Sequence, residues 1–277
     1  MKKAEKRNPF YILQSLPEIY TKLLKRDVTV ELLLPANFKH SNQKYPLLIL
    51  NDGQDNNKMD MEGILEKLTR EEAIQEIIVA SVFAGDRLQE YGVSMKSDFK
   101  KRGSRAKLYS KFLVKELIPY LYYQYPVSEL ASDHAIAGYS MGGLSAIDVA
   151  WNHTEVFSKA GAFSGSFWWR KRDTKSRFYS DQRDRLMHLQ IRKEKFKPGL
   201  SFWFQAGTND ELSDRNKNGV IDSIDDTLDL IVELTKKGYR PFYDIHYVET
   251  PGGEHNHNTW KKVMPDFLKW AFGKKAI

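Results

Sequence analysis

The stretch Gly138-Tyr139-Ser140-Met141-Gly142 lies between two segments of different character, and it decides how the chain folds around it. The apolar run 134–137 before it is typical of a buried strand, and residues 144–151 after it have the composition of a helix. A serine between strand and helix, with glycine two positions before and after it, forms a nucleophile elbow. Cβ atoms at the glycine positions would clash with the neighbouring strand and helix. We therefore predict that Ser140 is a nucleophile at a helix N-terminus.

The composition of the chain indicates a folded globular protein. With 277 residues, 41% hydrophobic and 13% aromatic, the chain can build one large α/β domain, and we interpret residues 1–277 as a single domain. Cysteine is absent, which excludes disulfides, zinc–thiolate sites and a thiol nucleophile. The basic stretch 1–7 is not followed by the apolar core of a signal peptide, and no run approaches membrane-spanning length. We expect a cytoplasmic protein without a membrane partner.

Strand-like and helix-like segments alternate along the middle of the chain. Apolar or alternating runs predict strands at 27–35, 45–50, 77–83, 134–137, 159–164, 200–205 and 241–248. Helical spacing predicts helices at 62–74, 104–123, 144–151 and 227–236, and from about 260 to the end. Such alternation predicts an α/β fold with a mostly parallel central sheet and helices on both faces.

Residues 166–199 form a basic segment, which we interpret as a cap-like insertion. Between Arg170 and Lys197 there are eleven Lys and Arg residues against four Asp and Glu, so this segment carries the whole net charge of +7. A solvated surface insertion explains the charge, and so does a cap that attracts an anionic substrate. No recognised nucleic-acid motif accompanies the segment, so we expect no nucleic-acid partner.

A serine nucleophile needs a base, and the base needs an acid that orients it. After an elbow of this kind the acid comes first and the histidine second, on loops beyond later strands. A late glycine-rich loop carries two histidines, of which we favour His255 as the base and expect His257 on the surface. For the acid, Asp210 fits best and Glu211 is the alternative.

The oxyanion of the tetrahedral intermediate needs two backbone N–H donors. Met141 follows the nucleophile directly and is expected to supply one of them. Gln54, in the turn after strand 45–50, is expected to supply the other.

Three further side chains are candidates for contact with the substrate. Trp168 and Trp169 follow a strand end on the catalytic side, and they either line an acyl or aromatic pocket or pack in the core. Arg87 either forms a buried structural ion pair with Glu90 or shapes the site, and we favour the ion pair.

Residues 214–225 have the spacing of a calcium loop. The oxygen ligands at positions 1, 3, 5, 7, 9 and 12 would be Asp214, Asn216, Asn218, the carbonyl of Val220, Asp222 and Asp225. Glycine stands at position 6, where the loop turns sharply. The alternative is a set of Asx and glycine turns that cap the next helix. A bound calcium would have a structural role, and we expect no cofactor to be required for catalysis.

The chain resembles the esterase D-like family of α/β-hydrolases, which includes enterochelin (siderophore) esterases, feruloyl esterases, S-formylglutathione hydrolases and mycolyltransferases. The resemblance extends from about residue 27 to 272 and is carried by the motifs at 50–54, 87–91, 138–143, 164–169 and 253–255 with Trp260. It implies an α/β-hydrolase fold, Ser140 as nucleophile, His255 as base, and the amides of Met141 and Gln54 as oxyanion donors. The resemblance identifies the catalytic acid less directly, because the loop that carries Asp210 is longer than is usual in the family.

Together these features predict a serine esterase that hydrolyses a carboxylic ester through an acyl-enzyme. The substrate expected is a small anionic or aromatic ester, such as a siderophore or hydroxycinnamoyl ester. An acyltransferase on the same triad is one alternative, since it would differ only in admitting an alcohol acceptor instead of water. A non-catalytic ligand-binding relative is the other, and the complete set of Ser, acid and His disfavours it.

Overall fold

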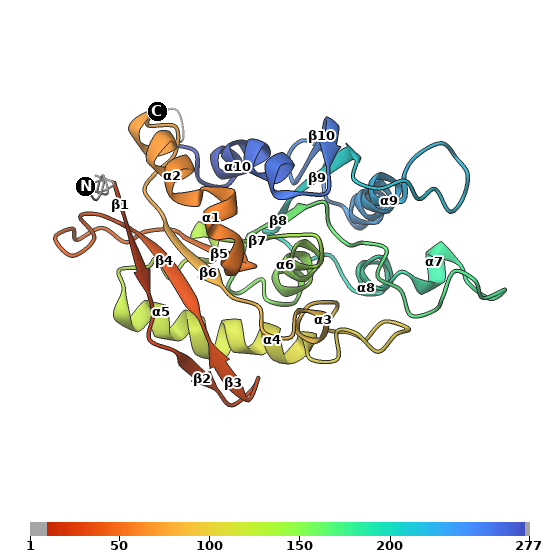
Figure 1. The fold of residues 1–277 in the computed structure, drawn as a ribbon, viewed down its shortest axis with the longest axis horizontal. Coiled ribbons are helices and arrows are strands. Elements are labelled where there is room, and N and C mark those ends of the chain that lie inside the picture. Colours follow the sequence, from red (N-terminus) through yellow and green to blue (C-terminus); the bar gives the residue numbers. More distant parts are fainter. Residues whose placement is uncertain (1–9, 275–277) are drawn as a thin grey trace, which may run out of the picture.

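The continuous apolar runs of the chain form the centre of one large sheet. The computed structural model describes residues 10–274, within which eight strands pair in the order β1-β4-β6-β5-β7-β8-β9-β10 (Figure 1). These strands are β1 (Tyr11–Ser15), β4 (Val30–Pro35), β5 (Leu47–Asn51), β6 (Ile78–Val82), β7 (His134–Tyr139), β8 (Lys159–Phe163), β9 (Ser201–Asn209) and β10 (Ile245–Glu254). A separate hairpin pairs β2 (Ile19–Thr21) with β3 (Arg26–Val28).

Only β4 runs against the other strands of the large sheet. It pairs antiparallel with β1 and β6, whereas every other pair in the sheet is parallel. The predicted mostly parallel sheet is therefore confirmed. Because parallel strands end at the same edge, the loops that follow β5, β7, β8, β9 and β10 meet there.

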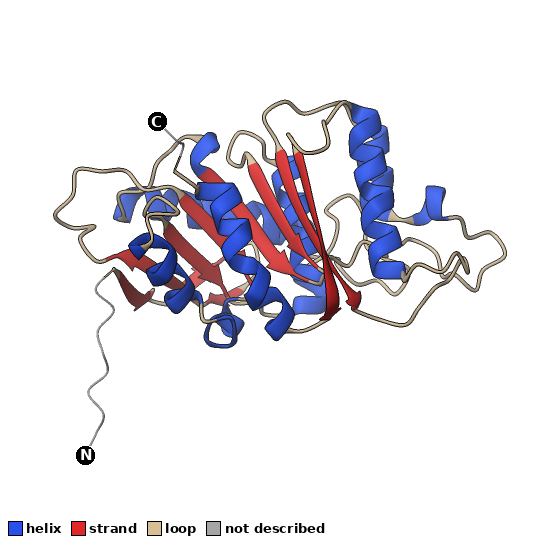
Figure 2. Cartoon of the chain, turned by 90° about the horizontal axis from the view of Figure 1, so that it is seen from above, coloured by secondary structure: helices blue, strands red, loops and turns tan. Residues whose placement is uncertain are grey.

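Helices cover both faces of the sheet (Figures 1 and 2). One face packs against α1 (Asn56–Met59), α2 (Met61–Arg70) and α10 (His257–Phe272). The other packs against α4 (Ala106–Phe112), α5 (Ile118–Gln124), α6 (Met141–Asn152), α8 (Leu186–Lys193) and α9 (Asp222–Lys237). The π-helical turn Leu113–Leu117 joins α4 to α5, so the long helix predicted at 104–123 is confirmed. Short helices are α3 (Arg87–Glu90) and α7 (Asp181–Asp184), with 3-10 turns at Gly53–Asp55 and Ala131–Asp133.

The structure departs from the strand predictions most clearly in three places. The strand predicted at 241–248 begins only at Ile245, because the segment before it is a turn closed by the pairing of Arg240 with Asp244. The strand predicted at 27–35 is divided into β3 and β4. The edge strand β1 was not predicted at all, since its residues alternate too weakly to be recognised without the neighbouring β4.

The basic segment 166–199 is anchored on the face that carries α6 and α9. Leu186, Met187 and Ile191 are buried in the core cluster of that face. Two of its arginines pair with acids of α9: Arg185 with Asp226 at 2.6 Å and Arg192 with Glu233 at 2.8 Å. Part of the positive charge of the segment is therefore neutralised within the fold.

None of the helices in residues 10–274 is long and apolar enough to cross a membrane. The basic stretch 1–7 lies outside the described residues.

Candidate active site

The elbow between β7 and α6 holds Ser140 in a conformation that L-residues rarely adopt. Its φ of 53° and ψ of −119° turn the chain sharply between strand and helix. Its backbone N–H donates to the carbonyl of Phe163 at 2.8 Å, and its carbonyl accepts from the N–H of Leu144 at 3.1 Å. These bonds to the neighbouring strand and to the helix keep the strained residue in place.

The glycines of the motif are required by close approach of the backbone. A Cβ atom on Gly138 would lie 2.5 Å from the carbonyl carbon of Gly142. A Cβ atom on Gly142 would lie 2.5 Å from a carboxylate oxygen of Asp52, in the turn after β5. The elbow therefore packs directly against the loop that was expected to carry the second oxyanion donor.

The three residues expected to form a triad line one cavity of about 320 Å³ at the carboxyl edge of the sheet. Ser140, Asp210 and His255 come from the loops after β7, β9 and β10. Met141 and Trp168 line the same cavity. In the described residues no hydrogen bond joins the imidazole to either partner, and the hydroxyl of Ser140 lies 3.2 Å from that of Ser166.

Asp210 is held by two donors and is largely buried. Its Oδ1 accepts from the hydroxyl of Ser164 at 3.0 Å, and its Oδ2 accepts from the amide of Gly207 at 3.0 Å. Burial raises the pKa of Asp210, and these donors together with the nearby charge of His255 act against the rise. Glu211 also lines the cavity, but the carboxylate whose charge acts on His255 is that of Asp210.

His255 is exposed, and its side chain lines the cavity beside Ser140. The ring meets Trp260 edge-on at 5.2 Å, and Trp260 stacks on Tyr139 at 5.1 Å. Partial burial lowers the pKa of His255 below its ordinary value of 6.5, and the charge of Arg87 lowers it further while Asp210 opposes the shift. The neutral imidazole that a general base requires is thereby favoured.

His257 is directed away from this cavity. Its Nε2 lies 3.1 Å from a carboxylate oxygen of Asp55, and it does not contribute to the cavity lining. Of the two histidines, only His255 lines the cavity together with Ser140.

Gln54 lies in the 3-10 turn that follows β5, and this turn is tied to the elbow by Arg87. The guanidinium of Arg87 binds Asp52 through two nitrogens, at 2.8 and 3.1 Å, and donates to the carbonyl of Tyr139 at 3.2 Å. The side chain of Gln54 accepts from the amide of Ala84 and donates to Asp52. Met141 lines the cavity, whereas Gln54 is outside its lining.

Arg87 and Glu90 do not pair with each other, so the expected ion pair is wrong. Glu90 is fully buried and binds Arg26 at 2.7 Å, whereas Arg87 binds Asp52. Both partners come from segments remote in sequence, which explains why local spacing favoured the wrong pair. Arg87 therefore holds the loop after β5, and its contact with the substrate stays a prediction.

The two tryptophans have different environments. Trp168 is half-buried and lines the cavity. Trp169 is fully buried in the core cluster, with its ring against Gly92 and Gly103. We therefore assign Trp169 to core packing, and only Trp168 stays a candidate for substrate contact.

The loop 214–225 closes on itself through hydrogen bonds. The carboxylate of Asp214 accepts from the amides of Asn218 and Gly219, and the side-chain amides of Asn216 and Asn218 donate to Asp225 at 2.8 and 3.2 Å. In residues 10–274 no group of three or more His, Cys, Asp or Glu side chains is placed to hold a metal ion. The calcium site therefore stays a prediction. The alternative, a set of Asx and glycine turns before α9, accounts for these hydrogen bonds.

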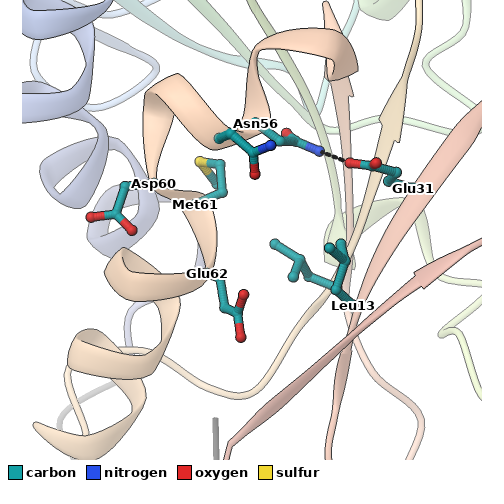
Figure 3. A pocket seen from close by; sticks show the side chains of 8 residues that line it. Leu13, Glu31, Asn56, Asp60, Met61 and Glu62 are labelled. Carbon is teal, nitrogen blue, oxygen red and sulfur yellow. Dashed lines mark hydrogen bonds between the residues drawn. The ribbon is translucent and has the colours of Figure 1, made fainter. Parts of the chain in front are cut away.

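Another cavity, of about 90 Å³, lies between the edge strands and the first helices (Figure 3). On one side of the cavity, Glu31 on β4 accepts a hydrogen bond from the side-chain amide of Asn56 at 3.1 Å. Asp60, Met61 and Glu62 lie on the other side. Its lining contains neither a serine nor a histidine, so it offers no pair of nucleophile and base like that at Ser140. This cavity therefore lacks the residues that acyl transfer requires.

Ser164, Ser166 and the contact of Trp260 with the histidine were not recognised as parts of the site. Ser164, with a φ of 47°, donates to Asp210 and accepts from the indole N–H of Trp260 at 2.9 Å. Ser166 contacts the nucleophile. The signal available was their position directly after β8, the parallel neighbour of the elbow strand.

Comparison with known proteins places the chain in a family. The model of the Esterase family ("Putative esterase") matches residues 21–271. Two proteins of Bacillus subtilis (strain 168), YbbA and YjcH, are both described as uncharacterized and are each 22% identical to this chain. The alignment with YbbA covers 88% of this chain and 92% of YbbA, and that with YjcH covers 91% and 94%.

Solved structures of esterases share the fold at low sequence identity. The enterobactin esterase FES from Shigella flexneri has a TM-score of 0.73 at 20% identity, over 94% of this chain and 58% of its own. An IroE-like serine hydrolase from Shewanella oneidensis has a TM-score of 0.70 at 19% identity, over 94% and 80%. The ferulic acid esterase AmCE1/Fae1A from Anaeromyces mucronatus has a TM-score of 0.67 at 17% identity, over 97% and 93%.

These likenesses show the fold, and the family match covers most of the chain. The protein belongs to the esterase family of α/β-hydrolases, as its motifs indicate, and it is a hydrolase that acts on esters.

Proposed function

We propose that the protein is a serine carboxylesterase that works through an acyl-enzyme on Ser140. The observation that carries the proposal is the cavity shared by Ser140, Asp210 and His255, three residues from three separate loops. The strained elbow and the lowered pKa of His255 support it, because both prepare a serine for attack on a carbonyl.

In the proposed reaction His255 takes the hydroxyl proton of Ser140 as the oxygen attacks the ester carbonyl. The amide of Met141 stabilises the oxyanion, and we propose that of Gln54 as the second donor. His255 then protonates the departing alcohol, and water, activated by the same imidazole, releases the acid from Ser140. Asp210 orients the imidazole and stabilises its charged form.

For the substrate we propose a small ester with an aromatic or anionic part. The half-buried Trp168 in the cavity wall supports an aromatic group, and the arginines of the segment 166–199 support an anionic one. Two of the structural relatives are named as esterases of enterobactin and of ferulic acid.

The test is hydrolysis of p-nitrophenyl acetate and butyrate by the wild type and by Ser140→Ala. We expect the variant to lose at least about a thousandfold in kcat, because the nucleophile is removed while the oxyanion donors stay. Circular dichroism and the Tm should be unchanged. Turnover retained in Ser140→Ala would refute the assignment.

We propose separately that loop 214–225 binds one structural calcium ion. The spacing of the oxygen ligands supports the proposal, and so does the approach of Asn216 and Asn218 to the Asp225 carboxylate, which brings three of the expected ligands together. Arg215 pairs with Asp222 at 3.0 Å, so Asp222 would reach the ion through water, as is common at position 9.

The calcium test is the Tm of protein treated with EDTA, before and after addition of calcium or magnesium. We expect calcium to raise the Tm and magnesium to have little effect, because the loop offers many flexible oxygen ligands. Asp214→Ala should abolish the calcium effect. An unchanged Tm with calcium would reject the proposal and leave the loop as a set of capping turns.

A further inference from the structure

A second cavity adjoins the cavity at Ser140 and shares two of its walls. Its volume is about 260 Å³, and Trp168 and Glu211 line both cavities. The rest of its lining is dominated by cations, Lys100, Arg102 and Arg170. The pocket that contains these cations is therefore the immediate neighbour of the cavity at Ser140.

Arg170 is the half-buried cation of this pocket that lacks an acidic partner in the described residues. Its Nε is buried and makes no hydrogen bond. The guanidinium lies 6.0 Å from the ring centre of Phe99, and 5.8 Å from those of Trp168 and Tyr179. Cation–π contacts stabilise the charge but leave the N–H donors without acceptors. An oxyanion held against Trp168 would supply the acceptors.

Two other charges of the pocket are already neutralised. Arg102 binds Asp98 through Nε at 2.7 Å, and Asp222 lies 3.0 Å from Arg215. Lys100 is exposed, forms no ion pair in residues 10–274, and contributes a second free positive charge.

Glu211 is the carboxylate of the lining that opposes an anionic ligand. Burial and the charge of Asp222 raise its pKa. Arg170 and Lys100 are two cations of the pocket that have no acidic partner in the described residues. Together they outweigh the one negative charge of Glu211, so the sum of the unpaired charges in the pocket is positive.

We propose that this pocket is an anion subsite, in which Arg170 and Lys100 bind a carboxylate carried by the substrate beyond the scissile ester. The inference rests on the proposed esterase function and narrows its substrates to small esters with an anionic group on the acyl or the alcohol part. Trp168 lies between the two cavities and would pack against the atoms that connect ester and carboxylate.

The test compares matched esters that differ in one negative charge. Mono-p-nitrophenyl adipate and its methyl ester place the charge on the acyl part, and 4-carboxyphenyl acetate and its methyl ester place it on the alcohol part. The measured quantity is the ratio of kcat/KM for the anionic ester to that for the neutral ester, at low and high salt. Variants are Arg170→Gln, Lys100→Gln and, as the matched control, Arg177→Gln, an exposed arginine of the same segment outside the lining.

We expect the wild type to favour the anionic ester of one pair, and salt to reduce the preference. Arg170→Gln should lower the ratio about tenfold, as expected for a charged hydrogen bond, with kcat/KM for the neutral ester within about twofold of wild type. Lys100→Gln should lower it less, and Arg177→Gln should leave it unchanged. Should Arg170→Gln fail to fold, the exposed Lys100 provides the deciding variant.

A ratio near one in the wild type, or equal losses in Arg177→Gln and Arg170→Gln, would overturn the anion subsite while leaving the esterase intact. Failure of the wild type to hydrolyse the neutral esters would overturn the proposed function and the subsite with it.

Discussion

The hydroxyl of Ser164 joins the two parts of the site that surround the imidazole. It donates to Asp210 and accepts from Trp260, whose ring meets His255 edge-on. Without this hydroxyl, Asp210 loses one of its two donors and the indole N–H loses its acceptor inside the protein. We therefore infer that Ser164 is a positioning residue for both acid and base.

Replacing Ser164 by alanine should lower kcat tenfold to about a hundredfold with little change in KM, because a charged hydrogen bond orients the acid. The matched control is Ser223→Ala, since Ser223 lines the same cavity and its buried hydroxyl makes no hydrogen bond in the described residues. Equal effects of the two substitutions on kcat would show that Ser164 serves packing alone.

The pH dependence of kcat/KM reports the protonation of His255. Since burial and Arg87 lower its pKa, the neutral base persists to lower pH, and the acid limb should lie below pH 6.5. The midpoint belongs to the coupled pair of His255 and Asp210. Arg87→Met removes a positive charge and should move the limb to higher pH. A limb above pH 6.5 in the wild type, or one that moves down in the variant, would contradict this arrangement.

At the scale of the element, the elbow depends on contact between β7, α6 and the turn after β5. Gly138→Ala would place Cβ 2.5 Å from the backbone of Gly142, and no side-chain movement can relieve that contact. We expect it to lower the free energy of unfolding by about 1 to 3 kcal/mol in urea titrations.

The control is Gly63→Ala in α2, where the added Cβ meets only the movable side chain of Asp60. There the helix gains from alanine, so the free energy of unfolding should stay equal or rise slightly. If Gly138→Ala were as stable as Gly63→Ala, the close packing of the elbow would be wrong.

Elements with a strong local signal were predictable from the sequence. The apolar runs of β5, β6, β7 and β8 and the helical spacing of α10 required no knowledge of their neighbours. The edge strand β1 is specified by its partner β4, a long-range contact that no local pattern contains.

The same distinction applies to the site. Ser140 and His255 belong to motifs with recognisable turns, and both line the expected cavity. Arg87 pairs with Asp52 and Glu90 pairs with Arg26, and in each case only folding brings the two residues close together. The separation of Trp168 from Trp169 follows from side-chain direction after β8, which composition does not specify.

At the scale of the whole molecule, the basic segment 166–199 is fastened to α9 by a buried charge network. Arg185 is 3% exposed and binds the fully buried Asp226, which also accepts from Arg215 at 2.6 Å. Asp226 is the most deeply buried acid of this network, and without it Arg185 keeps only the more exposed Asp229 and Asp181 as partners. The network therefore holds the segment that supplies Arg170 to the proposed anion subsite.

Asp226→Ala should destabilise the protein by about 1 to 3 kcal/mol, because Arg185 and Arg215 each lose a charged hydrogen bond, and expose the segment 166–199 to limited proteolysis. Asp229→Ala is the matched control, because Asp229 also pairs with Arg185 but is 46% exposed. The control should cost about 1 kcal/mol or less. Similar losses of unfolding free energy in the two variants would show that the burial of Asp226 does not add to the stability of the fold.

The most direct test of the account is covalent trapping of the nucleophile. Wild-type protein treated with a fluorophosphonate should carry a single adduct that peptide mass spectrometry locates on Ser140. Labelling should be lost in Ser140→Ala, strongly slowed in His255→Ala, and retained in His257→Ala. An unlabelled wild type, or an adduct on another residue that survives Ser140→Ala, would contradict the proposed catalytic site.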